Sequence, residues 1–317
     1  MAFSLCGSLT SVTIPSSVTS IGEEAFIGCE SLASVTIPAG VTSIGDRAFA
    51  YCTSLTSITV DNQNSAYSSA DGVFFNKNRT VLIQYPPSKQ RTSYTIPAGV
   101  TSIGERAFSS CNSLTSVTIP SSVTSIGDYA FSGCESLTSV TVDNQNSAYS
   151  SADGVLFNKN RTVLIAYPAG KQGTYIIPKG VIFIGDYAFG WCYSLTSVTM
   201  PAGVTSIGDS AFSLCESLTS VTIPAGVTSI GERAFSFCGS LASITIPSSV
   251  ISIGEEAFSF CGSLTSVTIP SSVTHIGEWA FYECSSLRTI TVSKITTLTA
   301  FIGEAAFPST ARIAYSD

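Results

Sequence analysis

The apolar positions of this chain recur with a 23-residue period, which is the spacing of Cys29 and Cys52. The first half of the repeat, seen as LASVTIP in residues 32–38, alternates apolar and polar residues. This alternation predicts a short strand with the aliphatic side chains facing inward and the Ser and Thr side chains facing outward. The proline predicts the end of the strand, because it has no N–H group to donate to a neighbouring strand.

The second half of the repeat, seen as VTSIGDRAFAYC in residues 41–52, predicts a return segment. We expect a turn at Gly45 and a short helical or 3-10 segment that begins at Asp46 and turns Phe49 toward the core. A single coil of this kind cannot bury its apolar side. Neighbouring coils must therefore stack, which places equivalent residues in columns, and the phenylalanine column should be the main apolar filler of the core.

A period of this length, together with the apolar pattern Leu32-x-x-Val35-x-Ile37, predicts a leucine-rich repeat solenoid. We expect right-handed 23-residue coils, a parallel β-sheet on the concave face and short helical or 3-10 turns on the convex side. The solenoid should extend over 1–317 as a single domain. The pattern loosens near the C-terminus, so we expect a degenerate capping coil at 293–317.

Two nearly identical stretches interrupt the repeat, at 61–93 and at 143–174. Each contains an Asp-Gly pair, which predicts a turn, and then two apolar runs joined by Asn-Lys-Asn-Arg; in the first stretch these runs are 73–75 and 81–85. Turn residues between such runs predict a β-hairpin. The chain therefore carries two hairpin-bearing insertions, which in solenoids often form a binding edge.

All ten cysteines occupy the same position of the repeat. Stacked strands place equivalent side chains about 4.7–4.9 Å apart with parallel Cα–Cβ vectors, whereas a disulfide needs Cβ atoms about 3.5–4.5 Å apart and approaching each other. We therefore expect a ladder of buried, reduced thiols rather than disulfides. Zinc is disfavoured, because the chain has no C-x-x-C pair and a single histidine. No metal and no cofactor is expected.

The repeat resembles that of the BspA-type leucine-rich repeat proteins, LxxVxIPxxVxxIGxxAFxxC. The insertions resemble the longer repeat variant of that family, with its YxSxDGVLFxK and TxLxxYP segments. The resemblance covers nearly the whole chain. It implies an extracellular or cell-surface protein of a host-associated bacterium or parasitic protist, in some cases one that adheres to host proteins or cells. The first residues nevertheless lack the basic and apolar regions of a signal peptide.

Composition restricts the partners. The net charge is −7 and the 14 basic residues are scattered, so nucleic acid is not an expected partner. No apolar run reaches the length of a membrane span, so membrane insertion is not expected either. Charged residues make up only 11% of the chain, and Ser and Thr supply the remaining polarity.

The outward Ser and Thr side chains of the strands form the first candidate binding surface. Solenoids bind partners on such faces, although these residues also suit an exposed sheet that binds nothing. A regular array of this kind could alternatively order water in an ice-binding protein. The candidate positions are Ser116, Thr118, Ser139, Thr141, Ser197, Thr199, Ser220 and Thr222.

The insertions supply the second candidate surface, through aromatic residues that could also serve packing. These are Tyr67, Tyr85, Tyr149 and Tyr167. The hairpin tips also carry glycosylation sequons at Asn78 and Asn160, which matter only in a protein secreted by a eukaryotic cell.

Two further features lead to weaker hypotheses. An acidic residue follows each Ile-Gly pair, where we expect it to accept hydrogen bonds from free N–H groups at the start of a helical turn; calcium bridging between coils is the alternative. The single histidine, His275, has no nucleophile beside it in a strained turn, so an enzyme is not expected.

The sequence therefore favours a non-enzymatic recognition or adhesion module that binds protein or glycan. The alternative is a structural scaffold that assembles end to end. The chain begins halfway through a coil, and an unpaired strand edge with exposed apolar side chains could bind a second copy.

Overall fold

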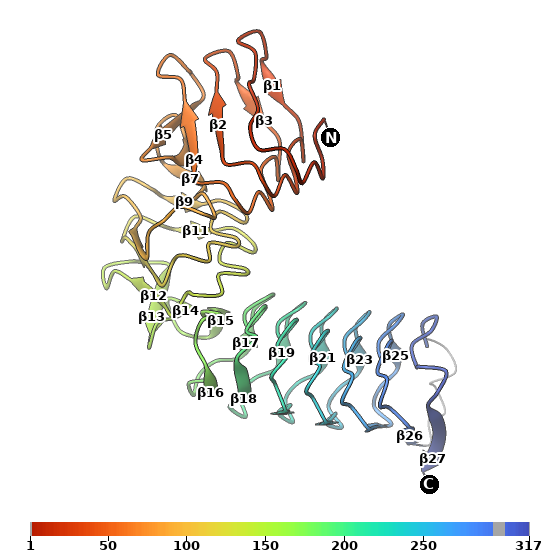
Figure 1. Ribbon diagram of the computed structural model, residues 1–317. Coiled ribbons are helices and arrows are strands. Elements are labelled where there is room, and N and C mark those ends of the chain that lie inside the picture. The colour runs from red at the N-terminus through yellow and green to blue at the C-terminus, as the bar shows by residue number, and fades with distance from the viewer. Residues whose placement is uncertain (1, 294–301, 317) are drawn as a thin grey trace. The chain divides into compact units, whose positions relative to one another are not determined.

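The computed structural model describes residues 2–293 and 302–316 and consists of stacked coils of β-structure (Figure 1). The coils group into two compact units, Met1–Gly154 and Val155–Asp317. The expectation of a single solenoid over 1–317 therefore stays a prediction, as do the hand of the coils and the placement of the strands on a concave face.

The first half of each coil forms a strand, and these strands pair in parallel with their equivalents in neighbouring coils to form separate sheets of two to four strands. Ser34 pairs with Ser57 and Val117 with Val140, so the predicted 23-residue spacing and parallel pairing are confirmed. In the first unit these strands are β2 (Ser34–Ile37), β4 (Ser57–Val60), β8 (Ser93–Thr95), β10 (Ser116–Ile119) and β12 (Ser139–Val142). In the second unit they are β16 (Gly173–Ile176), β18 (Leu195–Thr199), β20 (Ser220–Thr222), β22 (Ser243–Thr245), β24 (Ser266–Ile269), β26 (Thr289–Ser293) and β27 (Arg312–Ser316).

A second column of two-residue strands forms from the Ser-Ile segment of each coil and also pairs in parallel, as Ser206 with Ser229. In the first unit this column contains β1 (Ser20–Ile21), β3 (Ser43–Ile44), β9 (Ser102–Ile103) and β11 (Ser125–Ile126). In the second unit it contains β17 (Phe183–Ile184), β19 (Ser206–Ile207), β21 (Ser229–Ile230), β23 (Ser252–Ile253) and β25 (His275–Ile276).

The insertions form antiparallel strands that rejoin the second column. In the first insertion these are β5 (Tyr67–Ala70), β6 (Val73–Asn76) and β7 (Val81–Gln84). In the second they are β13 (Tyr149–Ala152), β14 (Val155–Asn158) and β15 (Val163–Ala166). The predicted hairpins are confirmed, because β6 pairs antiparallel with β7 and β14 with β15. Strand β7 then pairs in parallel with β9, and β15 with β17, in the position of the usual Ser-Ile strand.

Strand β5 is an element that the sequence analysis did not predict. It pairs antiparallel with β6 across the predicted Asp71-Gly72 turn. Both turn residues have positive φ values, 50° and 74°, as a two-residue type I′ turn requires. The sequence of β5, YSSA, lacks the β-branched aliphatic residues by which strands are usually recognised.

The return segments contain no helix within residues 2–293 and 302–316, so the expected helical or 3-10 segments are not found. Each regular return segment is a pair of successive turns with two left-handed residues four positions apart. In one coil these are Glu24, with φ 53°, and Gly28, with φ 68°. A left-handed residue interrupts the run of right-handed residues that a helix needs.

The left-handed residues direct alternate N–H groups toward the next coil. The donor and acceptor pairs are Glu24 and Asp46, Phe26 and Ala48, and Gly28 and Ala50, at 3.0, 2.8 and 2.9 Å. Residues between these donors close turns within their own coil; the N–H of Ile27 donates to the carbonyl of Glu24, for example. We call this series of bonds between coils the turn ladder. It occupies the N–H groups that a helix would use internally.

The glycine that precedes each turn allows the coils to approach closely. A Cβ atom on Gly254 would lie 2.6 Å from the backbone nitrogen of Glu232 in the preceding coil, which no side chain can tolerate. Glycine is required here by this contact between two main chains.

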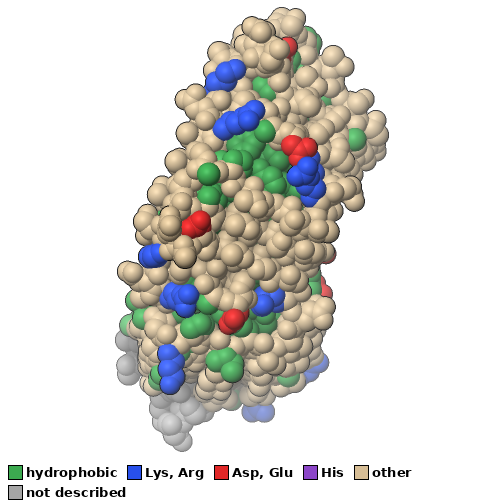
Figure 2. Space-filling model, turned by 90° about the vertical axis from the view of Figure 1, so that its left-hand side faces the viewer, with side chains coloured by type: hydrophobic (Ala, Val, Ile, Leu, Met, Phe, Trp, Pro, Cys, Tyr) green, Lys and Arg blue, Asp and Glu red, His purple; other side chains and the backbone are tan. Residues whose placement is uncertain are grey.

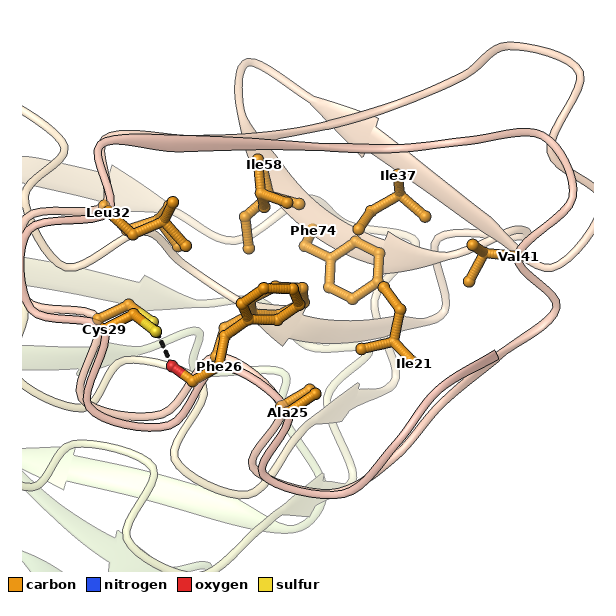
Figure 3. Close-up of a cluster of buried hydrophobic side chains, with 14 residues drawn as sticks. Ile21, Ala25, Phe26, Cys29, Leu32, Ile37, Val41, Ile58 and Phe74 are labelled. Carbon is orange, nitrogen blue, oxygen red and sulfur yellow. Dashed lines mark hydrogen bonds between the residues drawn. The ribbon is translucent and has the colours of Figure 1, made fainter. Parts of the chain in front are cut away.

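The core of each coil lies between the two strand columns and the turn ladder. Figure 3 shows Leu32 and Ile37 from one side and Ile21 and Val41 from the other packing around Phe26. Equivalent phenylalanines stack from coil to coil. The rings of Phe212 and Phe235 have centroids 5.1 Å apart and an interplanar angle of 1°, and both are fully buried.

The cysteines form the expected ladder of free thiols, and nine of the ten are buried. Each buried thiol donates to a main-chain carbonyl of the preceding coil; Cys238 contacts the carbonyl of Phe212 and Cys261 that of Phe235, both at 3.2 Å. Burial is the largest cause that raises the pKa of the Cys52 thiol to about 12, and it also raises the pKa values of Cys238 and Cys261.

The last described coil continues the same columns. Phe307 stacks on Phe281 with centroids 5.7 Å apart, and β27 pairs in parallel with β26. The part of the predicted capping coil at 294–301 lies outside the described residues.

The phenylalanine column yields a first test. The substitution Phe212→Ala should lower the free energy of unfolding by about 3–5 kcal/mol, because it leaves a cavity between two stacked rings. The matched control, Phe237→Ala, removes a ring that is 41% exposed and should cost less than about 1 kcal/mol. Urea unfolding midpoints measure both; equal midpoints would contradict the assignment of Phe212 to the core.

The thiol ladder predicts a steep loss of stability at alkaline pH. Above the ordinary thiol pKa of 9.0, unfolded thiols ionise while folded ones stay protonated. The unfolded state then binds fewer protons, so stability is complete below pH 9 and falls as pH rises toward the folded pKa values, by up to about 1.4 kcal/mol per thiol and pH unit. Replacing Cys52, Cys238 and Cys261 with Ala should flatten this slope in urea titrations between pH 8.5 and 11. An unchanged slope would show that these thiols ionise in the folded protein.

Candidate binding surfaces

The predicted Ser and Thr positions lie in register on the first strand column of each unit. In the first unit Ser116 pairs with Ser139 and Thr118 with Thr141. In the second unit Ser197 pairs with Ser220, while Thr199 and Thr222 follow on the same strands. Thr141, Thr199, Ser220 and Thr222 are exposed, and Ser116, Thr118, Ser139 and Ser197 are half-buried. Figure 2 shows one face of the molecule, on which the charged side chains are scattered.

The hydroxyl groups of the second unit's strand column are not used to hold the coils together. Within the described residues, Thr199, Ser220 and Thr222 have no hydrogen-bonding partner for their side chains. The threonine that precedes the strand does connect two coils, because the hydroxyl group of Thr219 donates to the carbonyl of Thr196 in the preceding coil at 3.2 Å. In the first unit, by contrast, the hydroxyl groups of Ser139 and Thr141 lie 3.5 Å apart, within hydrogen-bonding distance of each other.

The insertion tyrosines divide into two structural roles. Tyr67 and Tyr149 are half-buried, and their hydroxyl groups accept the N–H groups of Ile44 and Ile126, at 2.9 and 3.0 Å. Each tyrosine hydroxyl group thereby replaces the backbone acceptor that the next Ser-Ile strand would provide.

Tyr85 and Tyr167 occupy the phenylalanine column of their coils. Tyr85 stacks on Phe108 and Tyr167 on Phe189, with centroids 5.4 and 5.0 Å apart. Their exposed fractions are 0% and 5%, so neither ring presents a surface to a ligand, and burial raises the pKa of both hydroxyl groups.

A buried asparagine, which the sequence analysis missed, fixes the start of the first insertion. Asn64 is fully buried, and its side chain makes four hydrogen bonds. Its Nδ2 donates to the carbonyls of Pro38 and Val41 at 2.8 Å, and its Oδ1 accepts the N–H groups of Ala66 and Tyr67 at 2.9 and 2.8 Å. All of its hydrogen-bonding capacity is satisfied. The repeated DNQN segment at the start of each insertion was the available signal.

The first insertion interrupts the turn ladder. After β7 the chain passes through Tyr85 and two prolines, so this coil has no Ile-Gly-x-x-Ala-Phe turn. Within the described residues, the N–H groups of Arg47, Phe49 and Tyr51 in the preceding coil consequently have no acceptor, although their equivalents Glu24, Phe26 and Gly28 are all bonded. An unpaired backbone group shielded from water costs about 1–3 kcal/mol.

A groove of about 240 Å³ occupies the place of the missing turn. We call it the turn slot. The half-buried side chains of Val81 and Ile83 contribute its apolar lining. Arg47 lies on one side and Arg106 on the other, and both are neutralised within the unit: Arg47 pairs with Glu24 at 2.8 Å, and Arg106 contacts Glu105 and lies 4.1 Å over the ring of Tyr129.

The second unit carries an exposed aromatic cluster on its turns. Phe237 and Phe260 stack with centroids 4.4 Å apart, and Tyr282 packs edge-on against Phe260 at 5.6 Å. These three side chains are about 40% exposed, at 41%, 39% and 41% respectively. Both phenylalanines have a φ of 58°, a conformation that bulky residues seldom adopt.

The acidic column connects coils. The Oδ1 atoms of Asp186 and Asp209 accept the N–H groups of Asp209 and Glu232, at 2.9 and 2.8 Å. The acids therefore accept backbone N–H groups as expected, but these belong to the next coil and not to a helical turn. His275 lies exposed in β25, and Asn78 and Asn160 are exposed between the hairpin strands.

Within residues 2–293 and 302–316, no group of three or more His, Cys, Asp or Glu side chains is arranged to hold a metal ion. No helix in this part of the chain is long and apolar enough to cross a membrane.

Stacked 23-residue coils with parallel strands in two columns define a β-solenoid of the leucine-rich repeat class. The sequence pattern of the BspA type leucine rich repeat region matches residues 1–92, 84–162 and 177–314, in six copies. The chain belongs to this family. No curated protein matches it.

Solved structures of bacterial proteins share the fold. The chain is 31% identical to a leucine rich cell surface protein of Faecalibacterium prausnitzii, with a TM-score of 0.62 over 93% of this chain and 90% of that one. It is 30% identical to a leucine-rich repeat protein of Eubacterium ventriosum, with a TM-score of 0.64 over 98% and 84%. The pneumococcal vaccine antigen PcpA, at 24% identity and a TM-score of 0.66 over 97% and 74%, shares the fold.

The role of Asn64 can be tested by its removal. Asn64→Ala should lower the free energy of unfolding by more than about 2 kcal/mol, because it leaves buried backbone groups without partners. The neighbouring exposed Asn62→Ala should change it by less than about 0.5 kcal/mol. Both are measured by urea unfolding, and an Asn64→Ala variant as stable as the control would show that these four hydrogen bonds contribute nothing.

Proposed function

We propose that this protein is a non-enzymatic recognition or adhesion module that binds protein or glycan at a cell surface. Its family membership supports this proposal, as does its similarity to a protein described as a leucine rich cell surface protein. The observation that carries it is the row of free hydroxyl groups on the first strand column of the second unit, represented by Thr199, Ser220 and Thr222.

These hydroxyl groups suit repeated hydrogen bonding to a polar partner. Each can donate one hydrogen bond and accept others, and its short side chain loses little conformational entropy on binding. Parallel pairing repeats the same groups at about 4.7–4.9 Å from strand to strand. A partner with several polar groups, such as a glycan chain or a protein loop, can therefore contact several coils at once, which raises avidity.

The aromatic cluster of Phe237, Phe260 and Tyr282 is a second candidate surface for the same function. Aromatic residues dominate the energetics of protein–protein interfaces. This surface favours a protein partner over a glycan.

The alternatives stay predictions. End-to-end association would use the first coil, where Leu5 is 78% exposed and Phe3 is 40% exposed. A groove lined by Phe3, Val12 and Ile14 lies at the same place. Ordering of ice by the Ser and Thr array would use the strand face proposed above for a partner.

The proposal is tested by solid-phase binding to matrix proteins and glycans. A variant with Thr199→Glu, Thr222→Glu and Thr245→Glu should bind at least about tenfold more weakly, because it adds three charges to the strand face. The matched control places the same change at Thr205, Thr228 and Thr274, which are exposed beside the second column.

Two other outcomes would distinguish the strand face from the aromatic cluster or contradict the proposal. Binding lost only in a variant with Phe237→Ser and Phe260→Ser would transfer the site to the aromatic cluster. No binding to any component of the panel would overturn the recognition function for these ligand classes.

A further inference from the structure

We infer that the turn slot of the first unit binds a short segment of a partner polypeptide through main-chain hydrogen bonds. The slot is a different surface from the Ser and Thr strand face. Three unpaired N–H donors in series, a groove beside them and an apolar lining distinguish the slot.

The donors define the hydrogen-bonding pattern that an occupant must have. Arg47, Phe49 and Tyr51 are alternate residues, and none of their N–H groups is bonded within the described part of the chain. Phe49 is only 3% exposed, so water has little access to this residue except through the groove that it lines. A buried N–H group of this kind requires a partner.

The preceding pair of coils shows which partner fits. There the equivalent donors Glu24, Phe26 and Gly28 bind main-chain carbonyls on alternate residues, at 2.8–3.0 Å. A polypeptide segment carries carbonyl groups with this alternation, whereas a glycan does not. The addition of a peptide to the unpaired edge of a ladder is an established mode of recognition.

The lining and charges of the slot support a neutral backbone over a free anion. Val81 and Ile83, which are half-buried, offer an apolar surface to one or two aliphatic or aromatic side chains of the segment. The two arginines already have carboxylate partners, Glu24 and Glu105, so little positive charge remains to attract an anion. Specificity would come from the side chain that contacts the apolar lining, and affinity from the backbone donors.

The test uses amide hydrogen exchange, followed residue by residue by NMR on the whole protein. In the free protein the amides of Arg47, Phe49 and Tyr51 should exchange faster than those of Glu24, Phe26 and Gly28. The ligand is an acetylated and amidated peptide with the sequence IGERAFSS, which is the turn of residues 103–110. At about ten times its Kd it should slow exchange of the three slot amides about tenfold and leave the other three unchanged.

Variants locate the effect in the slot. Ile83→Glu should abolish the protection by placing a charge on the apolar lining, while the amide of Phe26 reports that the coils remain folded. The matched control, Ile251→Glu, alters a half-exposed isoleucine of the second unit and should keep full protection. The strand-face variant with three Thr→Glu substitutions should bind the peptide as the unaltered protein does, so failure of one proposal does not imply failure of the other.

Three outcomes would overturn the inference: no protection by the peptide in the unaltered protein, equal protection by sodium acetate, or equal protection by maltohexaose. The second would indicate a simple anion site and the third a glycan site. A scrambled peptide serves as the negative control for sequence preference at the apolar lining.

Discussion

The hydrogen bonds that run from each coil to the next are the constraint on which the rest of this protein depends. They require equivalent residues to lie opposite one another, as Ser34 lies opposite Ser57 and as the N–H of Phe26 meets the carbonyl of Ala48. A coil that gained or lost one residue would break both contacts, because side chains in a strand alternate between faces. The stacked rings and the thiol–carbonyl contacts follow from the same register, and so does the requirement for glycine where two main chains meet.

The insertions show what happens when the period is interrupted. Their hairpins return the chain to the second strand column, where β7 pairs with β9, and Tyr85 returns it to the aromatic column. The turn ladder is not restored, which leaves three donors and a groove in the first unit. Where a coil lacks the element to which its neighbour would bond, the missing element creates a candidate binding site without any residue that marks it.

Much of the fold could be predicted from the sequence, and the exceptions have a common cause. The strands, hairpins, phenylalanine column and free thiols follow from the positions of apolar residues. The return segments were wrongly expected to be helical, because the spacing from Ala48 to Cys52 places these residues on one side of a helix and equally on one side of two successive turns. Strand β5 and the role of Asn64 were missed, since polar residues without periodicity carry no such signal. The outward Ser and Thr positions could be predicted, whereas for Tyr85 and Tyr167 the sequence left packing and ligand contact both open, and the tertiary structure buries them.

The sequence by itself determined the 23-residue period, and with it the register of the sheets and the content of the core, because identical neighbours stack only in one alignment. The tertiary structure decided the conformation of the turns. Residues such as Arg233 and Phe237 adopt left-handed backbone angles that their own sequence disfavours, and the hydrogen bonds of the adjacent coil stabilise them there. The turn slot likewise exists only in three dimensions, since it is formed by donors of one coil whose acceptors are missing from the next.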